Sequence, residues 1–392
     1  MKWEKIEEIE FGNLYIEDSK NGIWKTSSFL GKGTSYIKMN ELFAKKFIGD
    51  DLSYELIELT NSEKEKLLLR NEDLLFSRTS VVPEGVGKCS IIVNITNELV
   101  FDSNIIRIRL NPSICYPKYI FYYFNSPFGR GQVLSLANGT AIKTIKGSDL
   151  KKLRIQLLPL PTQRKIANIL SAYDDLIENN SKRIKLLEEK AFLRYKMIVS
   201  GEKLEEVKLK EVARVNQSTL KGNSNLEKLL YVDIASVSTG NIDNKTEYDL
   251  KDAPGRAKRI LNHEDIIWSC VRPNRKSYSF VFKPEDNLIA STGFAVITPT
   301  EIPSTFLYQL TITNEFVSYL ENHAKGATYP AVTATDFEEA TIYIPQSSSM
   351  IEYHEEIYRH FELKDILQKQ NTKLREARDI LLPRLMNGEI EV

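Results

Sequence analysis

The chain has 392 residues, of which 42% are hydrophobic and 27% are charged. This length exceeds what one hydrophobic core holds comfortably, so we expect at least two domains of an ordinary globular protein. Lysine plus arginine and aspartate plus glutamate each number 53, so the formal net charge is zero. That balance argues against a protein that coats nucleic acid through bulk charge, but it allows basic residues to gather on one face.

The cysteines and the hydropathy of the chain indicate the compartment in which the protein works. Cys89, Cys115 and Cys270 are odd in number and widely spaced, which favours free thiols in a reducing compartment over disulfides or a zinc site. No run of about eighteen apolar residues occurs, and residues 1–8 lack the apolar stretch of a signal peptide. We therefore expect a cytoplasmic protein with no membrane span.

The chain contains a long internal repeat, which predicts two halves of the same fold. The matching segments are, in pairs, 138–140 with 325–327, 200–202 with 387–389, 73–77 with 265–269, and 5–9 with 208–212. The offset is 187 residues for the first two pairs and rises to 192 and 203 for the others. Such drift is expected where surface loops differ in length.

The first part of each half mixes short strand-like runs with loops. In residues 104–110, apolar residues alternate with Arg107 and Arg109, which is the period-two pattern of a strand. Further strands and short helices are predicted at 279–282, 294–297, 116–124 and 304–311. We expect the aromatic residues of these helices in the core rather than on a base-stacking platform.

The second part of each half is a predicted long helix. Residues 162–199 contain no proline or glycine, Pro161 suits a helix start, and Gly201 offers a stop. Steps of four and three residues mark a mostly apolar seam, which is typical of coiled-coil packing. The seam runs through Ile166, Leu170, Tyr173, Ile177, Asn180, Ile184 and Leu187, and continues through Ala191, Arg194 and Ile198.

The second long helix is predicted over 350–382, where Pro383 should end or kink it. The same register gives a less apolar seam, and Phe361, Leu363 and Ile366 suggest a shifted packing stripe. The register includes Leu367, Asn371, Leu374 and Leu381. Asn180 and Asn371 occupy seam positions, where a polar residue can fix the register. The pattern does not give the orientation; antiparallel pairing follows if the two globular domains lie at opposite ends.

Motifs of catalysis are incomplete in this chain. Residues 111–114 resemble the Asn-Pro-Pro-aromatic motif of amino-methyltransferases, but Ser113 and Ile114 break it. Residues 85–89 lack the upstream glycine and the hydroxyl of a phosphate-binding loop, and 354–358 lack the second histidine of a metalloprotease helix. We expect no catalytic residues and no metal site.

The start of the first long helix carries a family resemblance. Residues 158–167, Leu-Pro-Leu-Pro-Thr-Gln-Arg-Lys-Ile-Ala, resemble the "PLPEQ-(R/K)-x-I" motif of specificity subunits of type I restriction–modification complexes. Residues 187–190 and 381–389 resemble that family's helix body and helix end, and 207–215 the start of a second target-recognition domain. The likeness spans essentially the whole chain, although the second helix start, 344–349, keeps only the proline.

This resemblance implies an α+β fold with two similar mixed α/β target-recognition domains. Each domain is followed by a long helix, and the two helices pair as an antiparallel coiled coil with pseudo-twofold internal symmetry. The implied boundaries are 1–158 for the first recognition domain, 159–200 for the central conserved helix, 201–345 for the second recognition domain, and 346–392 for the C-terminal conserved helix.

The resemblance also implies a non-catalytic subunit that recognises a bipartite, asymmetric site in double-stranded DNA. The paired helices would set the spacing of the half-sites and dock two modification (methyltransferase) subunits, and restriction (translocase and nuclease) subunits would join them. No cofactor is expected on this chain, because S-adenosylmethionine, ATP and magnesium would serve the partner subunits.

Discrimination between bases in the major groove needs Arg, Lys, Asn or Gln on loops, and glycines let the backbone approach phosphate. The candidate DNA-binding residues are Arg78, Lys88, Gly139, Lys143 and Lys146 in the first half, and Arg272, Asn274, Arg275, Lys276, Lys325 and Gly326 in the second. The cluster 272–276 is the strongest. Each of these charges could instead be simply solvated.

Two other classes of function stay open at this point. A structural adaptor, in which the coiled coil joins two protein-binding domains, also agrees with zero net charge. An unrecognised nuclease or transferase would need a cluster of carboxylates or a nucleotide site, and neither is visible in the sequence, although carboxylates can converge from distant positions.

Overall fold

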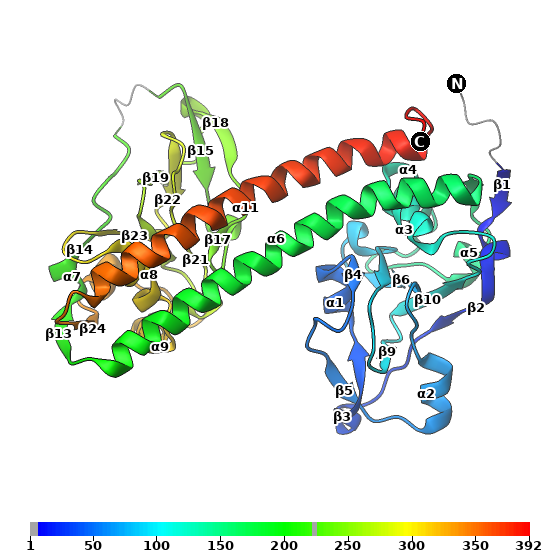
Figure 1. The fold of residues 1–392 in the computed structure, drawn as a ribbon, viewed down its shortest axis with the longest axis horizontal. Helices are drawn as coiled ribbons and strands as arrows, with labels where there is room; N and C mark the ends of the chain where they lie inside the picture. Colours follow the sequence, from blue (N-terminus) through cyan, green and yellow to red (C-terminus); the bar gives the residue numbers. More distant parts are fainter. Residues whose placement is uncertain (1–6, 222–225) are drawn as a thin grey trace. The chain divides into compact units, whose positions relative to one another are not determined.

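A computed structural model describes residues 7–221 and 226–392 (Figure 1). The chain forms two compact units, of which the first comprises residues 1–178 with 372–392 and the second comprises 179–371. The inference about a signal peptide and the start of the repeat segment 5–9 fall largely on residues 1–6, outside the described residues. No helix in the described ranges is long and apolar enough to cross a membrane.

The first unit contains a five-stranded sheet of order β2-β10-β6-β8-β4, a three-stranded sheet β5-β3-β9, and the pairs β1-β12 and β7-β11. The strands are β1 (Glu7–Glu10), β2 (Tyr15–Asn21), β3 (Leu30–Ile37), β4 (Phe47–Ile48), β5 (Glu55–Ile57), β6 (Leu74–Ser77), β7 (Thr79–Ser80), β8 (Cys89–Ile92), β9 (Leu99–Phe101), β10 (Ile105–Leu110), β11 (Lys143–Thr144) and β12 (Arg154–Leu157). Its short helices are α1 (Met39–Ala44), α2 (Asn61–Leu67), α3 (Pro117–Asn125), α4 (Pro127–Ser135) and α5 (Gly147–Leu150).

The second unit contains two four-stranded sheets, β14-β23-β20-β21 and β18-β15-β22-β19, and the pairs β13-β24 and β16-β17. The strands are β13 (Leu204–Lys208), β14 (Ala213–Val215), β15 (Lys228–Val232), β16 (Val237–Ser238), β17 (Asn241–Ile242), β18 (Thr246–Asp249), β19 (Ala257–Ile260), β20 (Ile266–Ser269), β21 (Tyr278–Phe280), β22 (Leu288–Ser291), β23 (Phe294–Pro299) and β24 (Thr341–Pro345). Its short helices are α7 (Leu209–Val212), α8 (Ser304–Thr311), α9 (Asn314–His323) and α10 (Ala334–Glu338).

The two units repeat one topology. The order β2-β10-β6-β8 of the first corresponds to β14-β23-β20-β21 of the second, and β5-β3-β9 corresponds to β18-β15-β22. In each of these two sets of three strands the corresponding pair is parallel: β3 with β9 in the first unit, and β15 with β22 in the second. The sequence repeat is therefore a repeat of the fold, and the predicted α+β class with two similar mixed domains is confirmed.

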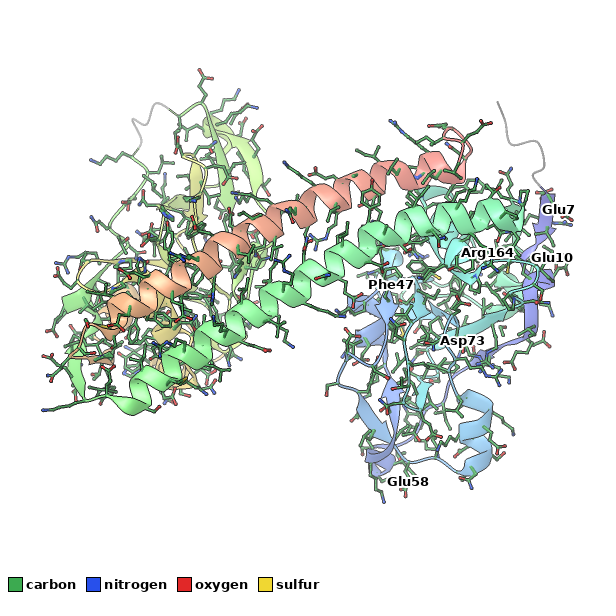
Figure 2. All side chains as sticks on the ribbon, in the orientation of Figure 1. Glu7, Glu10, Phe47, Glu58, Asp73 and Arg164 are labelled. Atoms are coloured by element: carbon green, nitrogen blue, oxygen red, sulfur yellow. The ribbon has the colours of Figure 1, made fainter. Side chains whose placement is uncertain are left out.

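Strand β10 follows the alternation read from the sequence, and both of its faces are covered. Its apolar side chains enter the core, whereas Arg107 is 1% exposed on the other face. Arg109 donates from Nε and Nη2 to the two carboxylate oxygens of Asp73, both at 2.7 Å, and from Nη1 to Glu17 at 2.6 Å. Figure 2 shows Asp73 inside the first unit. A buried carboxylate requires such a partner, because an unpaired charge in the interior is strongly destabilising.

In the second unit, the buried carboxylate at the equivalent position is hydrogen-bonded by neutral groups instead of an arginine. Asp265, the counterpart of Asp73, is fully buried. It accepts one hydrogen bond from the Thr298 hydroxyl at 2.6 Å and one from the Asn262 backbone amide at 2.7 Å. Burial raises the pKa of the Asp265 carboxyl above its ordinary value. The fold is thus conserved between the halves while the polar contacts inside it differ.

Two long helices run through the chain, α6 (Leu160–Gly201) and α11 (Ser349–Met386). Helix α11 continues through Pro383 for three further residues, so the proline does not end it; the other alternative, a kink at Pro383, stays a prediction. The turn at Gly388, with φ of 77°, follows instead. Ile366 is 50% exposed while Leu367 and Asn371 are buried. The suggested shifted stripe is therefore wrong at Ile366.

In the second unit the helices pair in opposite directions. The Tyr353 hydroxyl donates to the Ala191 carbonyl at 3.1 Å, and the Asn180 amide donates to the Asn371 side-chain oxygen at 3.0 Å. Residue numbers thus rise along α11 as they fall along α6. In the first unit the Arg378 guanidinium pairs with Asp174, which continues the same order. The predicted antiparallel pairing is confirmed.

Each globular core is completed by both helices. The core of the first unit contains Ile166 and Leu170 from α6 and Leu382 and Leu385 from α11. The core of the second contains Ala191, Tyr195 and Ile198 from α6 together with Tyr353, Ile357 and Phe361 from α11. The first unit therefore depends on side chains that lie more than two hundred residues farther along the chain.

This dependence predicts that Leu385→Ala destabilises the first unit by about 3 kcal/mol, because Leu385 is 1% exposed and truncation leaves a cavity. Amide hydrogen exchange in β6 and β10 would report the loss. Ile380→Ala is the matched control on the same helix, since Ile380 is 55% exposed, and its effect should stay below about 0.5 kcal/mol. Equal protection of β6 and β10 in the two variants would contradict this account of the core.

Candidate nucleic-acid interface

In the first unit, two loops that are distant in sequence are joined by a short ladder. Strand β7 pairs with β11, so that Ser80 lies opposite Lys143 and Thr79 opposite Thr144. The Asn138 and Thr144 backbones exchange two hydrogen bonds of 3.0 and 2.8 Å, which closes a hairpin over residues 139–143. The structure thus brings the loop after β6 beside this hairpin.

The second unit builds the same arrangement at equivalent positions. Lys325 and Ala331 exchange two backbone hydrogen bonds of 2.9 Å, and Val271 forms a bridge with Ala331. Matching the two ladders makes Gly139 equivalent to Gly326, and Ser80 equivalent to Arg272. We call the residues 78–88 with 138–146, and 270–276 with 324–332, the two-loop tips of the first and second units.

All five basic or glycine candidates of the first half lie on its two-loop tip. Arg78 is half-buried and donates to the Ser103 carbonyl at 3.3 Å. Lys88 is exposed, with its ammonium 5.3 Å from the centre of the Phe43 ring. Lys143 is half-buried, and Lys146 and Gly139 are exposed. The guanidinium of Arg78 thus makes a hydrogen bond within the unit, while Lys88 and Lys146 face solvent.

The candidates of the second half also gather on one tip. Asn274, Arg275, Lys325 and Gly326 are exposed. The Lys276 ammonium approaches the Asn314 side-chain oxygen at 3.4 Å. The half-buried Arg272 donates through its backbone to the Pro330 carbonyl at 2.7 Å and through Nη2 to the Thr328 carbonyl at 3.2 Å. Arg272 therefore ties the two loops of the tip together.

The loop 270–276 carries backbone strain. Arg272 and Lys276, with φ of 51° and 54°, flank the single turn Pro273–Arg275. A left-handed conformation costs a residue with a Cβ about 1–2 kcal/mol. Strain of this kind persists where surrounding contacts over-determine it and is common at binding sites. It agrees with a loop shaped for a contact outside the fold.

Sequence reasoning missed the apolar residues on the two tips. Ile142 is 54% exposed and its equivalent, Tyr329, is 66% exposed. In the first unit Val81 and Val82 are exposed as well, at 76% and 54%. The repeat offset of 187 residues, applied to the hairpins, would have aligned Ile142 with Tyr329. Neither is an Arg, Lys, Asn or Gln, the residue types expected to contact base edges.

The predicted seam residues face the paired helix or the adjoining core to different extents. Lys364, at a seam position, donates to Glu188 at 2.6 Å and to the Gly240 carbonyl at 2.8 Å. Lys182, Arg183 and Lys185, which lie off the seam, are exposed. The buried seam residues are Ile166, Leu170, Asn180, Leu367 and Asn371, and the half-buried ones are Tyr173, Ile177, Ile184, Leu187, Leu374 and Leu381.

The incomplete catalytic motifs have structural roles. Residues 85–89 connect β7 to β8, and a Cβ on Gly87 would lie 2.2 Å from the Val133 side chain. His354 contacts the Thr305 hydroxyl at 3.1 Å. The three cysteines are free, and burial raises the pKa of the Cys115 and Cys270 thiols to about 12 and 11. Among the described residues, no group of three or more His, Cys, Asp or Glu could hold a metal ion.

Comparison with known proteins agrees with the duplicated fold. The family model described as type I restriction modification DNA specificity domain matches twice, at residues 2–189 and 201–359. The chain therefore belongs to that family.

Individual relatives cover nearly the whole chain. It is 22% identical to the type I restriction enzyme MjaIX specificity subunit of Methanocaldococcus jannaschii, over 100% of this chain and 98% of that one. The MjaVIII specificity subunit of the same organism is 24% identical, with 88% and 85% covered. The fold also resembles the crystal structure of the S subunit of a type I restriction–modification system from M. genitalium, with a TM-score of 0.61 and 17% identity over 97% of this chain and 96% of that one.

Gly139 provides a test of the tip's architecture. Its φ is 106°, and a Cβ would lie 2.2 Å from the Ile142 carbonyl oxygen, so Gly139→Ala should open the hairpin at a cost of about 1–2 kcal/mol. Hydrogen exchange at the Asn138 and Thr144 amides should then accelerate about tenfold. Gly131→Ala is the control, because a Cβ there meets nothing within 4 Å. Unchanged exchange in Gly139→Ala would show that the hairpin does not need this glycine.

Proposed function

We propose that this chain is the reading subunit of a type I restriction–modification complex and that each of its two units recognises one half of a split, asymmetric DNA site. The observation that carries this proposal is the two-loop tip, which recurs at equivalent positions in both copies of the specificity domain. The two tips share a backbone frame but differ in side chains. Two readers of this kind would accept two different half-site sequences.

The chemistry of the tips fits direct readout of bases. Arg275 and Asn274 are exposed on a strained, well-connected loop, and these residue types make bidentate contacts with guanine and adenine edges. Lys88, Lys146 and Lys325 are exposed beside the hairpins, where they would contact phosphates and position the tip. Basic side chains would thus act locally at the tips, although the net charge of the whole chain is zero.

The outer faces of the long helices fit protein partners. Several large apolar side chains on them are half to two-thirds exposed; they are Leu176, Leu186, Leu193, Met197, Ile351, Ile366 and Ile380. Apolar side chains on a helix face are typical of a surface that packs against another protein. We propose that two modification subunits dock on these helices and that restriction subunits join through them. S-adenosylmethionine, ATP and magnesium would act in those partners, and this chain would carry out no chemistry itself.

The alternative left open by the sequence, an adaptor that joins two protein-binding domains, predicts a different response to DNA. An adaptor would show no preference among DNA sequences. A reader that contacts phosphates loses affinity steeply as salt rises, because bound cations return to the DNA.

Selection of bound duplexes from a random library tests the proposal. The chain, assembled with its modification subunits, should enrich DNA with two short constant blocks at a fixed separation, and binding should weaken as salt is raised. Arg275→Gln should relax one block and reduce affinity about tenfold, as expected for a lost base contact. Lys251→Gln, also exposed in the second unit, is the control. Absence of any shared block with an active modification subunit would favour the adaptor.

The helices provide a second prediction. If their length sets the separation of the half-sites, then inserting seven residues into both α6 and α11, in register, should lengthen the preferred spacer. Seven helical residues add roughly 10 Å, which corresponds to about three base pairs. Both half-site sequences should remain unchanged. Altered half-sites with the original spacer would contradict a measuring role for the helices.

A further inference from the structure

The two-loop tip of the second unit exposes the ring of Tyr329 to solvent beside the guanidinium of Arg272. Tyr329 is 66% exposed, although it lies in a well-connected hairpin. The guanidinium carbon of Arg272 lies 4.6 Å from the centre of its ring. A single exposed apolar side chain is ordinary on a protein surface, but Tyr329 is distinguished by the guanidinium against its ring and by its place on a tip that both units share.

Arg272 holds this ring through contacts with the same hairpin. Its backbone amide donates to the Pro330 carbonyl at 2.7 Å and its Nη2 donates to the Thr328 carbonyl at 3.2 Å, on either side of Tyr329. The φ of 51° at Arg272 is part of this geometry. The guanidinium therefore lies over the ring before any ligand arrives, which reduces the entropy lost on binding.

The equivalent residue of the first unit is also apolar and exposed. Ile142 follows Gly139 at the same spacing as Tyr329 follows Gly326, and the two glycines have φ of 106° and 105°. Ser80 occupies the position of Arg272 and offers no guanidinium. The first tip thus carries a branched aliphatic side chain where the second carries a cation-backed aromatic ring.

We infer that Tyr329, backed by Arg272, is a specificity-determining residue whose ring contacts the edge of a base in the half-site read by the second unit, and that Ile142 makes the corresponding apolar contact in the other half-site. The base edges are what a duplex exposes in its major groove, and aromatic and aliphatic side chains both suit the methyl group of thymine there. The inference rests on the proposed function and deepens it, because it names the contacts that make the two readers differ.

The test compares half-site preferences of four variants in the assembled complex, again by selection of bound duplexes. Tyr329→Ala should reduce discrimination at one or two base pairs of a single half-site about tenfold, as expected for loss of one base-edge contact. Arg272→Lys should weaken the same half-site, because an ammonium cannot stack as a guanidinium does. Ile142→Ala should affect only the other half-site. Tyr329→Phe should retain the preference, because it keeps the ring.

Tyr343→Ala is the matched control, because Tyr343 is 51% exposed in the second unit but lies on β24, away from the two-loop tip. Wild-type preferences in Tyr329→Ala, or equal losses in both half-sites, would overturn the inference. A loss in Tyr329→Phe as large as in Tyr329→Ala would overturn the ring as the contacting group and point to the hydroxyl instead. These results are distinct from failure of the proposed function, in which the wild-type complex itself would enrich no split site.

Discussion

The structure depends on one constraint, which is that neither globular core is complete without side chains from both long helices. Leu382 and Leu385 of α11 pack with Ile166 and Leu170 of α6 in the first unit. Tyr353 and Phe361 do the same beside Ala191 and Tyr195 in the second. Burial of such side chains is the main favourable contribution to folding. The helices are consequently part of each domain rather than a separate linker between them.

This constraint separates what is shared by the two halves from what differs. The strand order and the parallel pair of each three-stranded arrangement recur, since these elements form the frame that packs on the helices. Inside the frame, Asp73 is neutralised by Arg109 whereas Asp265 accepts from Thr298. On the tips, Ile142 stands where Tyr329 stands. A frame held by apolar packing tolerates such changes, so the loops can acquire different recognition chemistry without a new fold.

Much of the architecture could be predicted because it rests on periodic patterns. The repeat offset, the heptad spacing of α6 and the alternation in β10 each reflect a face that must be buried, and a buried face leaves a regular trace in sequence. The position of Asn180 on the seam followed from this spacing, and the structure places its side chain against Asn371. Loop residues leave no such trace. The left-handed conformation of Arg272 and its place over the ring of Tyr329 arise from contacts between segments about sixty residues apart and could not be predicted.

Two details of α11 differ from the expectation for different physical reasons. Pro383 lacks an amide hydrogen, yet α11 passes through it, and the neighbouring Leu382 and Leu385 are buried in the first core. Tertiary packing thus outweighs the local penalty of a proline. Ile366 was grouped with Phe361 in a shifted stripe because it is apolar, but it is half exposed. It lies instead among the apolar side chains that we assign to partner docking.

The central claim is that this chain alone determines which DNA sequence its complex recognises. The most direct test maps adenine methylation by long-read sequencing in cells that express the cognate modification subunit with and without this chain. The account predicts methylation at a new split motif that disappears when the chain is omitted. Methylation at the same motif without the chain, or no motif despite an active modification subunit bound to the chain, would contradict it.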